Sequence, residues 1–193
     1  MKFDPFTRIL HLLVAIGVTL QLALSLVMVA PKPDRAENVW YEAHEFFGTT
    51  LVVVISVYWV WIIARTVARD EPFMLFPWFS PRLRQALIDD VKATMNDLAA
   101  KRLPSAQTVK PLPAAVQGLG LLLALFMAMT GTVVELGMGP DGSLPPLVHA
   151  VKEVHETMAP LMWAYLVVHP LVGFLHQFMG ERIVSSMFDF KNR

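Results

Sequence analysis

Three histidines lie within one long apolar stretch, VHETMAPLMWAYLVVHPLVGFLHQF, which covers residues 154–178. They are His155, His169 and His176. An imidazole can bind a metal, donate or accept a hydrogen bond, or carry a proton. A polar ring surrounded by hydrocarbon is costly unless it has such a partner. These histidines therefore indicate chemistry that takes place inside an apolar environment.

The spacing of the three histidines places them on one face of a helix. A residue advances about 100° around an α-helix, so 14 residues return to within roughly 40° of the start and 21 residues to within roughly 60°. His169 follows His155 by 14 residues, and His176 follows it by 21. At about 1.5 Å per residue, His155 and His169 are roughly 21 Å apart along the axis.

The elements that must position these side chains are long apolar blocks. Over half of the 193 residues are hydrophobic, and the formal net charge is zero. Four blocks, at about residues 9–30, 46–64, 114–134 and 158–179, exceed the roughly 18 apolar residues that indicate a membrane-spanning helix. The first run, of about 22 residues, is too long for a typical signal peptide. We expect an all-α integral membrane protein, a four-helix bundle that forms a single domain over residues 1–193 in contact with membrane lipid.

Lysine and arginine predict the orientation of these helices. Residues 1–8, 65–112 and 181–193 hold two, eight and three of them, which is 13 of the 16 in the chain. Both termini and the long loop are therefore expected in the cytoplasm, with the protein in the inner membrane of a bacterium. The two shorter loops would face the periplasm with a net charge of about minus five. This charge favours a cationic partner, although ordinary solvation of loops explains it equally well.

The long cytoplasmic loop is predicted to contain an amphipathic helix. Ser80 and Pro81 are typical of a helix start, and Pro104 is typical of a stop. One face between them is apolar, and aromatic residues precede it. We expect this helix to lie on the membrane surface, or to offer a docking surface to a cytoplasmic partner.

With this orientation the histidines form two layers. His44 and His155 lie just before the second and fourth blocks, at the outer side, whereas His11 and His169 lie deeper, with His176 nearby. Two imidazoles that face each other across a bundle can hold a haem iron from both sides. The chain has no cysteine, which excludes covalent attachment through C-x-x-C-H. Two b-type haems would form an electron route across the membrane, and spacing alone leaves His169 and His176 as alternative inner ligands.

Other interpretations remain open at this point. An intramembrane histidine is often a hydrogen-bonded packing residue or part of a proton path. A metal transporter would usually add carboxylates in mid-membrane, but no Asp or Glu lies in the interior of any block. Gly48, one turn after His44, gives room to a porphyrin or to closer helix packing. Arg8 and Arg65, at the inner ends of two blocks, would pair with haem propionates or reach towards lipid headgroups.

Motifs along the whole chain resemble the bacterial di-haem cytochromes b561 and the related cytochrome b subunits of respiratory formate dehydrogenases and nickel–iron hydrogenases. FTRILHLLVAIGV is similar to their first helix, with a basic residue three positions before the histidine. HEFFGTTLVVVISVYWVWIIAR is similar to the second helix, with glycine one turn after the histidine and arginine at the inner end. HETMAPLMWAYLVVHPLVGFLH carries the H-E-T start, the 14-residue histidine spacing and a further histidine seven residues on.

The resemblance implies a role for each of these histidines. His44 and His155 would bind the iron of an outer haem b, and His11 and His169 the iron of an inner one. His176 would lie beside the inner haem, where relatives bind ubiquinone or menaquinone as electron acceptor.

The expected function is transmembrane electron transfer from a periplasmic donor to quinone, with no catalytic side chain and no nucleic-acid partner. The long loop and the tail MGERIVSSMF resemble members that serve a dehydrogenase, so the donor would be a periplasmic redox protein or a dehydrogenase subunit. The alternative is a stand-alone superoxide:quinone oxidoreductase, which the compact start of the fourth block resembles. Acidic outer loops favour a protein partner, because superoxide is an anion.

Overall fold

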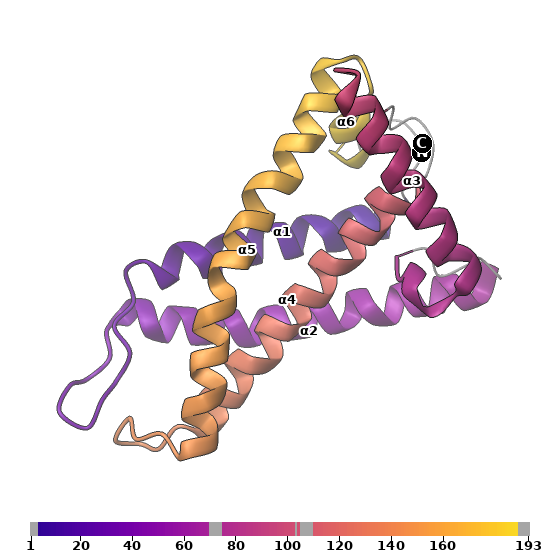
Figure 1. Ribbon diagram of the computed structural model, residues 1–193. Coiled ribbons are helices and arrows are strands. Elements are labelled where there is room, and N and C mark those ends of the chain that lie inside the picture. The colour runs from indigo at the N-terminus through magenta and orange to yellow at the C-terminus, as the bar shows by residue number, and fades with distance from the viewer. Residues whose placement is uncertain (1–3, 70–74, 103, 105–109, 189–193) are drawn as a thin grey trace. The chain divides into compact units, whose positions relative to one another are not determined.

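The computed structural model describes residues 4–69, 75–102, 104 and 110–188. Within these ranges the chain is helical, and the elements are α1 (Pro5–Ser25), α2 (Val39–Arg69), the short 3₁₀-helix η1 (Pro77–Phe79), α3 (Pro81–Ala99), α4 (Pro111–Gly137), α5 (Pro146–Phe178) and α6 (Ile183–Phe188) (Figure 1). The all-α fold is therefore confirmed. Residues 1–3 and 189–193, which carry part of the positive charge used to predict cytoplasmic termini, lie outside the described ranges.

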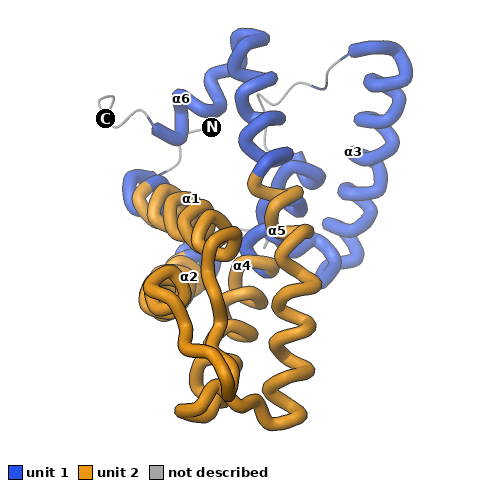
Figure 2. Tube along the Cα trace, turned by 90° about the vertical axis from the view of Figure 1, so that its left-hand side faces the viewer, with its two compact units in different colours: residues 1–8, 62–122, 167–193 blue, residues 9–61, 123–166 orange. Residues whose placement is uncertain are grey.

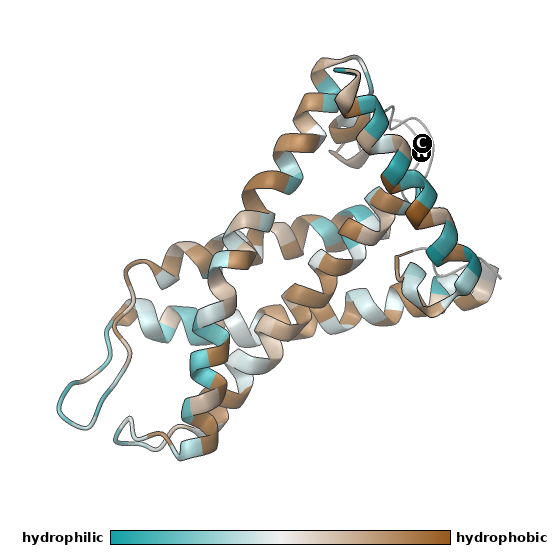
Figure 3. Ribbon diagram, viewed as in Figure 1, coloured by the Kyte–Doolittle hydropathy of each residue, from teal (hydrophilic) through white to brown (hydrophobic). Residues whose placement is uncertain are grey.

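Four of the described helices, α1, α2, α4 and α5, are long and apolar enough to cross a membrane. Their ribbons are largely brown in Figure 3, whereas α3 is largely teal. Large apolar side chains on them are exposed, among them Val53 and Leu171 at 60% and 62%. An exposed apolar surface of this kind is stable in hydrocarbon, where a helix also satisfies its own backbone hydrogen bonds. The prediction of four membrane-spanning helices is confirmed.

The helix ends differ from the ends of the apolar blocks. The first block extends to residue 30, but α1 ends at Ser25. Asn38 stabilises the chain beyond that end: its amide nitrogen donates to the Val27 carbonyl (3.1 Å), and its side-chain oxygen accepts from the Val29 amide (2.9 Å). The same oxygen accepts from the Tyr41 amide (3.1 Å) and so caps the start of α2.

The other spanning helices continue beyond their apolar blocks. Both ends of α2 and α4 lie outside the predicted ranges 46–64 and 114–134, and α5 begins at Pro146 rather than at residue 158. A count of apolar residues stops at the first charged residues, whereas a helix continues until its backbone is capped or broken. His155 therefore lies well inside α5 and not at its start.

The chain forms two compact units (Figure 2): unit 1 contains residues 1–8, 62–122 and 167–193, and unit 2 contains residues 9–61 and 123–166. The boundaries fall within α1, α2, α4 and α5. The core of unit 2 is a cluster of buried apolar side chains from all four of these helices: Leu22, Leu51, Ile55, Ala124 and Met162. This cluster fixes the parts of the helices that carry the site described below. The single domain expected over residues 1–193 stays a prediction.

In unit 1, the segment before α3 lies against the first part of α4. Phe76 and Pro77 are fully buried there. Gly118 allows the Leu75 backbone to approach α4, because a Cβ at position 118 would lie 2.0 Å from the Leu75 carbonyl oxygen. Only a residue without a side chain fits at that distance.

The amphipathic helix predicted in the long loop is α3. Its Asp90 carboxylate accepts a hydrogen bond from the Leu112 amide (3.0 Å), one of the amides that α4 leaves without a partner in its first turn. Lys101 has a φ of 55°, and the Arg102 amide bonds the Asp97 carbonyl (2.8 Å), which ends the helix as in a Schellman motif. The position of α3 on the membrane surface stays a prediction.

Candidate functional site

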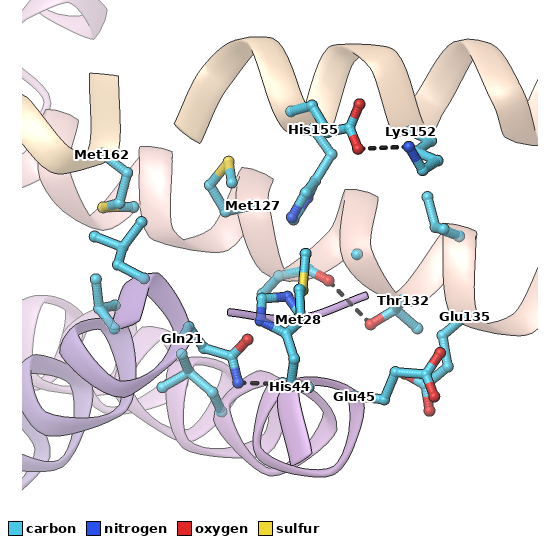
Figure 4. Close-up of a pocket in the computed structure, with 18 of the residues that line it drawn as sticks. Gln21, Met28, His44, Glu45, Met127, Thr132, Glu135, Lys152, His155 and Met162 are labelled. Carbon is cyan, nitrogen blue, oxygen red and sulfur yellow. Dashed lines mark hydrogen bonds and ion pairs between the residues drawn. The ribbon is translucent and has the colours of Figure 1, made fainter. Parts of the chain in front are cut away.

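A cavity in unit 2 is lined by two of the predicted site histidines, His44 of α2 and His155 of α5. Their rings point towards each other in the close-up of Figure 4. The cavity volume is about 140 Å³, roughly ten times the minimum that one buried water requires. Much of its wall is apolar and comes from α1, α2, α4 and α5, with Val18, Leu22, Leu51, Met127 and Met162 among the lining residues. The structure thus brings the predicted outer pair together in one apolar cavity.

His44 is held through its backbone rather than through its ring. Gln21 of α1 donates a hydrogen bond to the His44 carbonyl (3.0 Å), which ties the two helices together in this unit. The ring nitrogen Nδ1 is buried and has no hydrogen-bond partner among the described residues. Such a nitrogen costs about 1–3 kcal/mol when nothing compensates it. A ring that binds a ligand in the cavity accounts for this buried, unpaired nitrogen better than a ring that only packs.

The His155 ring has a partner in α4. Its Nδ1 lies 2.9 Å from the hydroxyl oxygen of Thr130, and this hydroxyl also bonds the Phe126 carbonyl (2.8 Å). A hydroxyl has one hydrogen, and a carbonyl can only accept. When the hydrogen goes to Phe126, the oxygen accepts from Nδ1–H of His155. This assignment leaves the lone pair on Nε2, the form in which a neutral imidazole binds a metal.

Glycines differ in how they serve the cavity. A Cβ at Gly131 would lie 3.3 Å from Cε1 of His155, tighter than an ordinary contact. A Cβ at Gly48, the glycine that the sequence favoured, would lie 3.7 Å from the side-chain amide of Gln21, which is an ordinary contact. Gly131 therefore gives the His155 ring its space, whereas the role of Gly48 at a haem stays a prediction. The sequence analysis did not identify Thr130. The only sign of it in the sequence is that a polar residue stands within an apolar block.

The cavity rim is mostly acidic. Glu45, Glu135, Glu156 and Lys152 line it. The Thr49 hydroxyl donates to the Glu135 carboxylate at 2.9 and 3.1 Å, and Lys152 pairs with Glu156 one turn later in α5. With more carboxylates than ammonium groups, the rim attracts cations.

The inner pair of histidines is divided between the two units. His11 belongs to unit 2 and His169 to unit 1. Both side chains are half-buried. Their pairing around one iron stays a prediction.

Arg65 has a carboxylate partner in unit 1. Its Nη1 lies 3.0 Å from Oδ2 of Asp4, and the other oxygen of Asp4 accepts from the Thr7 amide (2.8 Å). Burial raises the pKa of the Asp4 carboxyl, but the hydrogen bonds from Thr7 and the charge of Arg65 outweigh it and hold that pKa below its ordinary value. Arg8 is buried. The roles of Arg8 and Arg65 towards haem propionates stay predictions.

His176 pairs with a carboxylate that the sequence analysis missed. Its Nδ1 lies 2.8 Å from Oε2 of Glu181, and the two side chains are only 13% and 11% exposed. Gly180 has a φ of 90°, which lets the Glu181 amide bond the His176 carbonyl (3.0 Å). This is a Schellman end of a helix, and it returns Glu181 to the histidine. The glycine after the last turn of α5 is the sequence signal for this helix end.

Apolar spanning helices and two imidazoles directed into one cavity are typical of membrane cytochromes of the b type. The family model described as prokaryotic cytochrome b561 matches residues 2–190, and the chain belongs to this family. The resemblance inferred from the sequence is thus confirmed. No curated protein and no solved structure matches the chain. The chain is a multi-pass membrane protein of a family that binds b-type haem and transfers electrons across the membrane.

Proposed function

We propose that the protein carries electrons across the bacterial inner membrane, from a donor at the outer face to quinone at the cytoplasmic side, and that it uses two b-type haems. The cavity between His44 and His155 is the observation that carries the proposal. These two residues would hold the outer haem, and His11 and His169 the inner one. When bound, haem supplies an iron that takes up and releases one electron at a time.

The residues of the cavity fit such a group. When Thr130 accepts from Nδ1–H, His155 presents Nε2 to the cavity. His44 has a buried ring nitrogen without a partner among the described residues. Apolar side chains around the two rings, such as Leu51 and Met162, keep water from the cavity and lower the local dielectric. The protein's own part is therefore to orient two ligands and to control their surroundings.

At the cytoplasmic side, His176 and Glu181 support a quinone site. A protonated imidazole donates from both nitrogens, so Nδ1–H can bond Glu181 while Nε2–H bonds a quinone carbonyl. The Nε2 proton can then pass to the reduced quinone oxygen, while Glu181 holds the other proton on Nδ1. Full reduction of one quinone takes two electrons and two protons. Protons taken from the cytoplasm would make the transfer electrogenic.

The predicted topology places both termini and the loop that contains α3 in the cytoplasm. Exposed Arg82, Arg84 and Lys92 on α3 are part of the positive charge that supports this orientation. The same orientation puts the acidic rim of the cavity at the periplasmic surface.

The acidic rim supports a cationic protein as the electron donor. Glu45, Glu135 and Glu156 would steer a basic surface towards the cavity and repel an anion. The stand-alone superoxide:quinone oxidoreductase is the alternative, and superoxide is an anion. We expect reduction by a cationic complex such as hexaammineruthenium(II) to be faster than reduction by iron(II)–EDTA, and the difference to shrink as salt is added. Rapid superoxide-dependent quinone reduction that superoxide dismutase abolishes would instead favour the alternative.

Proteoliposomes test the function itself. The purified protein would be reconstituted with ubiquinone or menaquinone, and a membrane-impermeant reductant would be added on the periplasmic side. We expect quinol to form and protons to be consumed on the opposite side. If both haems are reduced but no quinol forms, quinone is not the acceptor.

A further inference from the structure

We propose that Thr130 is a positioning residue for the His155 imidazole: its hydroxyl oxygen keeps the proton on Nδ1 and thereby makes Nε2 the atom that binds iron. This inference rests on the proposed role of His155 as a haem ligand. It assigns a function to a side chain that the sequence motifs did not single out.

The contacts of Thr130 favour a hydrogen bond that the ring donates from Nδ1. Oγ1 of Thr130 lies 2.9 Å from Nδ1. The hydroxyl oxygen of Thr130 also lies within hydrogen-bond distance of two backbone carbonyls of its own helix, Phe126 at 2.8 Å and Met127 at 3.1 Å, either of which can take its one hydrogen. When that hydrogen lies on a carbonyl, the Thr130 oxygen can only accept from the ring, and the ring proton is then on Nδ1.

The same contact orients the ring. Thr130 and Gly131 are consecutive in α4: the first bonds Nδ1, and the second leaves space beside Cε1, where a Cβ would lie 3.3 Å away. The hydrogen bond at Nδ1 and the close contact beside Cε1 together restrict rotation of the imidazole. Iron ligation needs this restriction, because ring orientation and tautomer are commonly set by the bond that the second nitrogen makes.

The two ligands of the proposed haem are therefore unequal. His155 donates from Nδ1 to Thr130, whereas Nδ1 of His44 has no partner among the described residues. A hydrogen bond donated from Nδ1 raises the basicity of the ligand nitrogen. A more basic ligand stabilises the oxidised iron. Loss of the Thr130 acceptor should therefore raise the midpoint potential of this haem and loosen its binding.

The experiment compares Thr130→Val, Thr130→Ser and Thr50→Val in the haem-loaded protein. Valine keeps the shape of threonine and removes the acceptor, whereas serine keeps the acceptor. Thr50 is the matched control, because its hydroxyl likewise bonds a carbonyl of its own helix, Phe46 (2.9 Å), but it is exposed and is not among the cavity-lining residues. The readouts are the haem content, the two midpoint potentials, the low-spin electron paramagnetic resonance signals, and the rate of haem transfer to apomyoglobin.

We expect Thr130→Val to raise one of the two midpoint potentials and leave the other unchanged. Its haem should transfer to apomyoglobin faster, in keeping with a roughly tenfold loss of affinity. Thr130→Ser should match the unsubstituted protein, and so should Thr50→Val. If T130V does not fold, Thr130→Ala removes the same acceptor with a smaller side chain and should give the same shift.

Two failures are distinguishable. If T130V retains both haems with unchanged potentials and resonance signals, Thr130 does not position the ring, and the proposed function stands. If His155→Ala retains both haems, His155 is not a ligand, and the assignment under the proposed function is wrong.

Discussion

Asp4 and Arg65, which are 61 positions apart in the sequence, form an ion pair with 3.0 Å between Oδ2 and Nη1. The other carboxylate oxygen caps α1 through the Thr7 amide. One carboxylate thus stabilises the start of the first helix and binds the last part of α2 in unit 1.

Asp4→Asn separates these two roles, because asparagine still caps a helix but carries no charge. The pKa of Asp4 lies below its ordinary value of 3.8, so its charge stabilises the fold above that pH. The contribution is lost as the pH falls through the folded-state pKa. We expect the free energy of unfolding of the unsubstituted protein to be higher than that of Asp4→Asn by up to about 1 kcal/mol at neutral pH. This difference should vanish in acid. Asp4→Ala should lower the free energy of unfolding by about 1 kcal/mol more, because alanine also removes the helix cap.

Thermal unfolding in detergent across this pH range measures both effects. A constant difference between the unsubstituted protein and Asp4→Asn at every pH would show that the ion pair does not stabilise the fold.

Gly118→Ala should disturb the segment before α3. The new Cβ would lie 2.0 Å from the Leu75 carbonyl oxygen, which is backbone and cannot rotate away. We expect a loss of about 1–3 kcal/mol and faster proteolysis between α2 and α3. Gly173→Ala is the matched control, since its Cβ would meet Val184 at 3.6 Å. Equal stability of the two variants would mean that this approach of Leu75 to α4 is not maintained.

Gly131→Val should crowd the His155 ring. Even an alanine Cβ would lie 3.3 Å from Cε1, and valine adds two methyl groups. We expect the purified Gly131→Val protein to contain about one haem less per chain. Val133→Ala, at an exposed position of the same helix that is not among the cavity-lining residues, should keep both. Pyridine haemochrome assays give the ratio of haem to protein. A full haem complement in Gly131→Val would show that haem binding does not need a glycine at this position.

Glu181→Gln should slow quinone reduction without loss of haem. Glutamine can still bond His176 but cannot balance the charge of a protonated imidazole, so proton delivery should weaken. We expect a lower rate of quinol formation in proteoliposomes, with unchanged haem spectra. Gln177→Asn is a control in the same turn, because the Gln177 side chain bonds Ser185 rather than His176. An unchanged rate for Glu181→Gln would show that this carboxylate is not part of the proton path.

The sequence was sufficient for features that depend on local order. Runs of apolar residues predicted four spanning helices, and the spacing of His155 and His169 predicted a shared helical face. Both depend only on the length and period of a helix. Helix ends were less accurate, because capping by side chains such as Asn38 decides them and hydropathy does not record it.

Contacts between helices could not be predicted in the same way. Thr130 is 25 positions from His155, and its contact depends on how α4 and α5 pack within unit 2. The Asp4–Arg65 pair likewise depends on tertiary structure, so the sequence offered only propionates or lipid headgroups as partners for Arg65. Glu181 was closer to being predictable, since Gly180 is a typical helix stop.

The most direct test of the central claim is haem quantitation with dithionite-minus-air difference spectra on His44→Ala and His149→Ala. His44 faces the cavity, whereas His149 is exposed in the first turn of α5. We predict two b-type haems per chain in the unsubstituted protein and in His149→Ala, and one in His44→Ala. A protein that is colourless despite ample haem supply, or two haems retained in His44→Ala, would contradict the account.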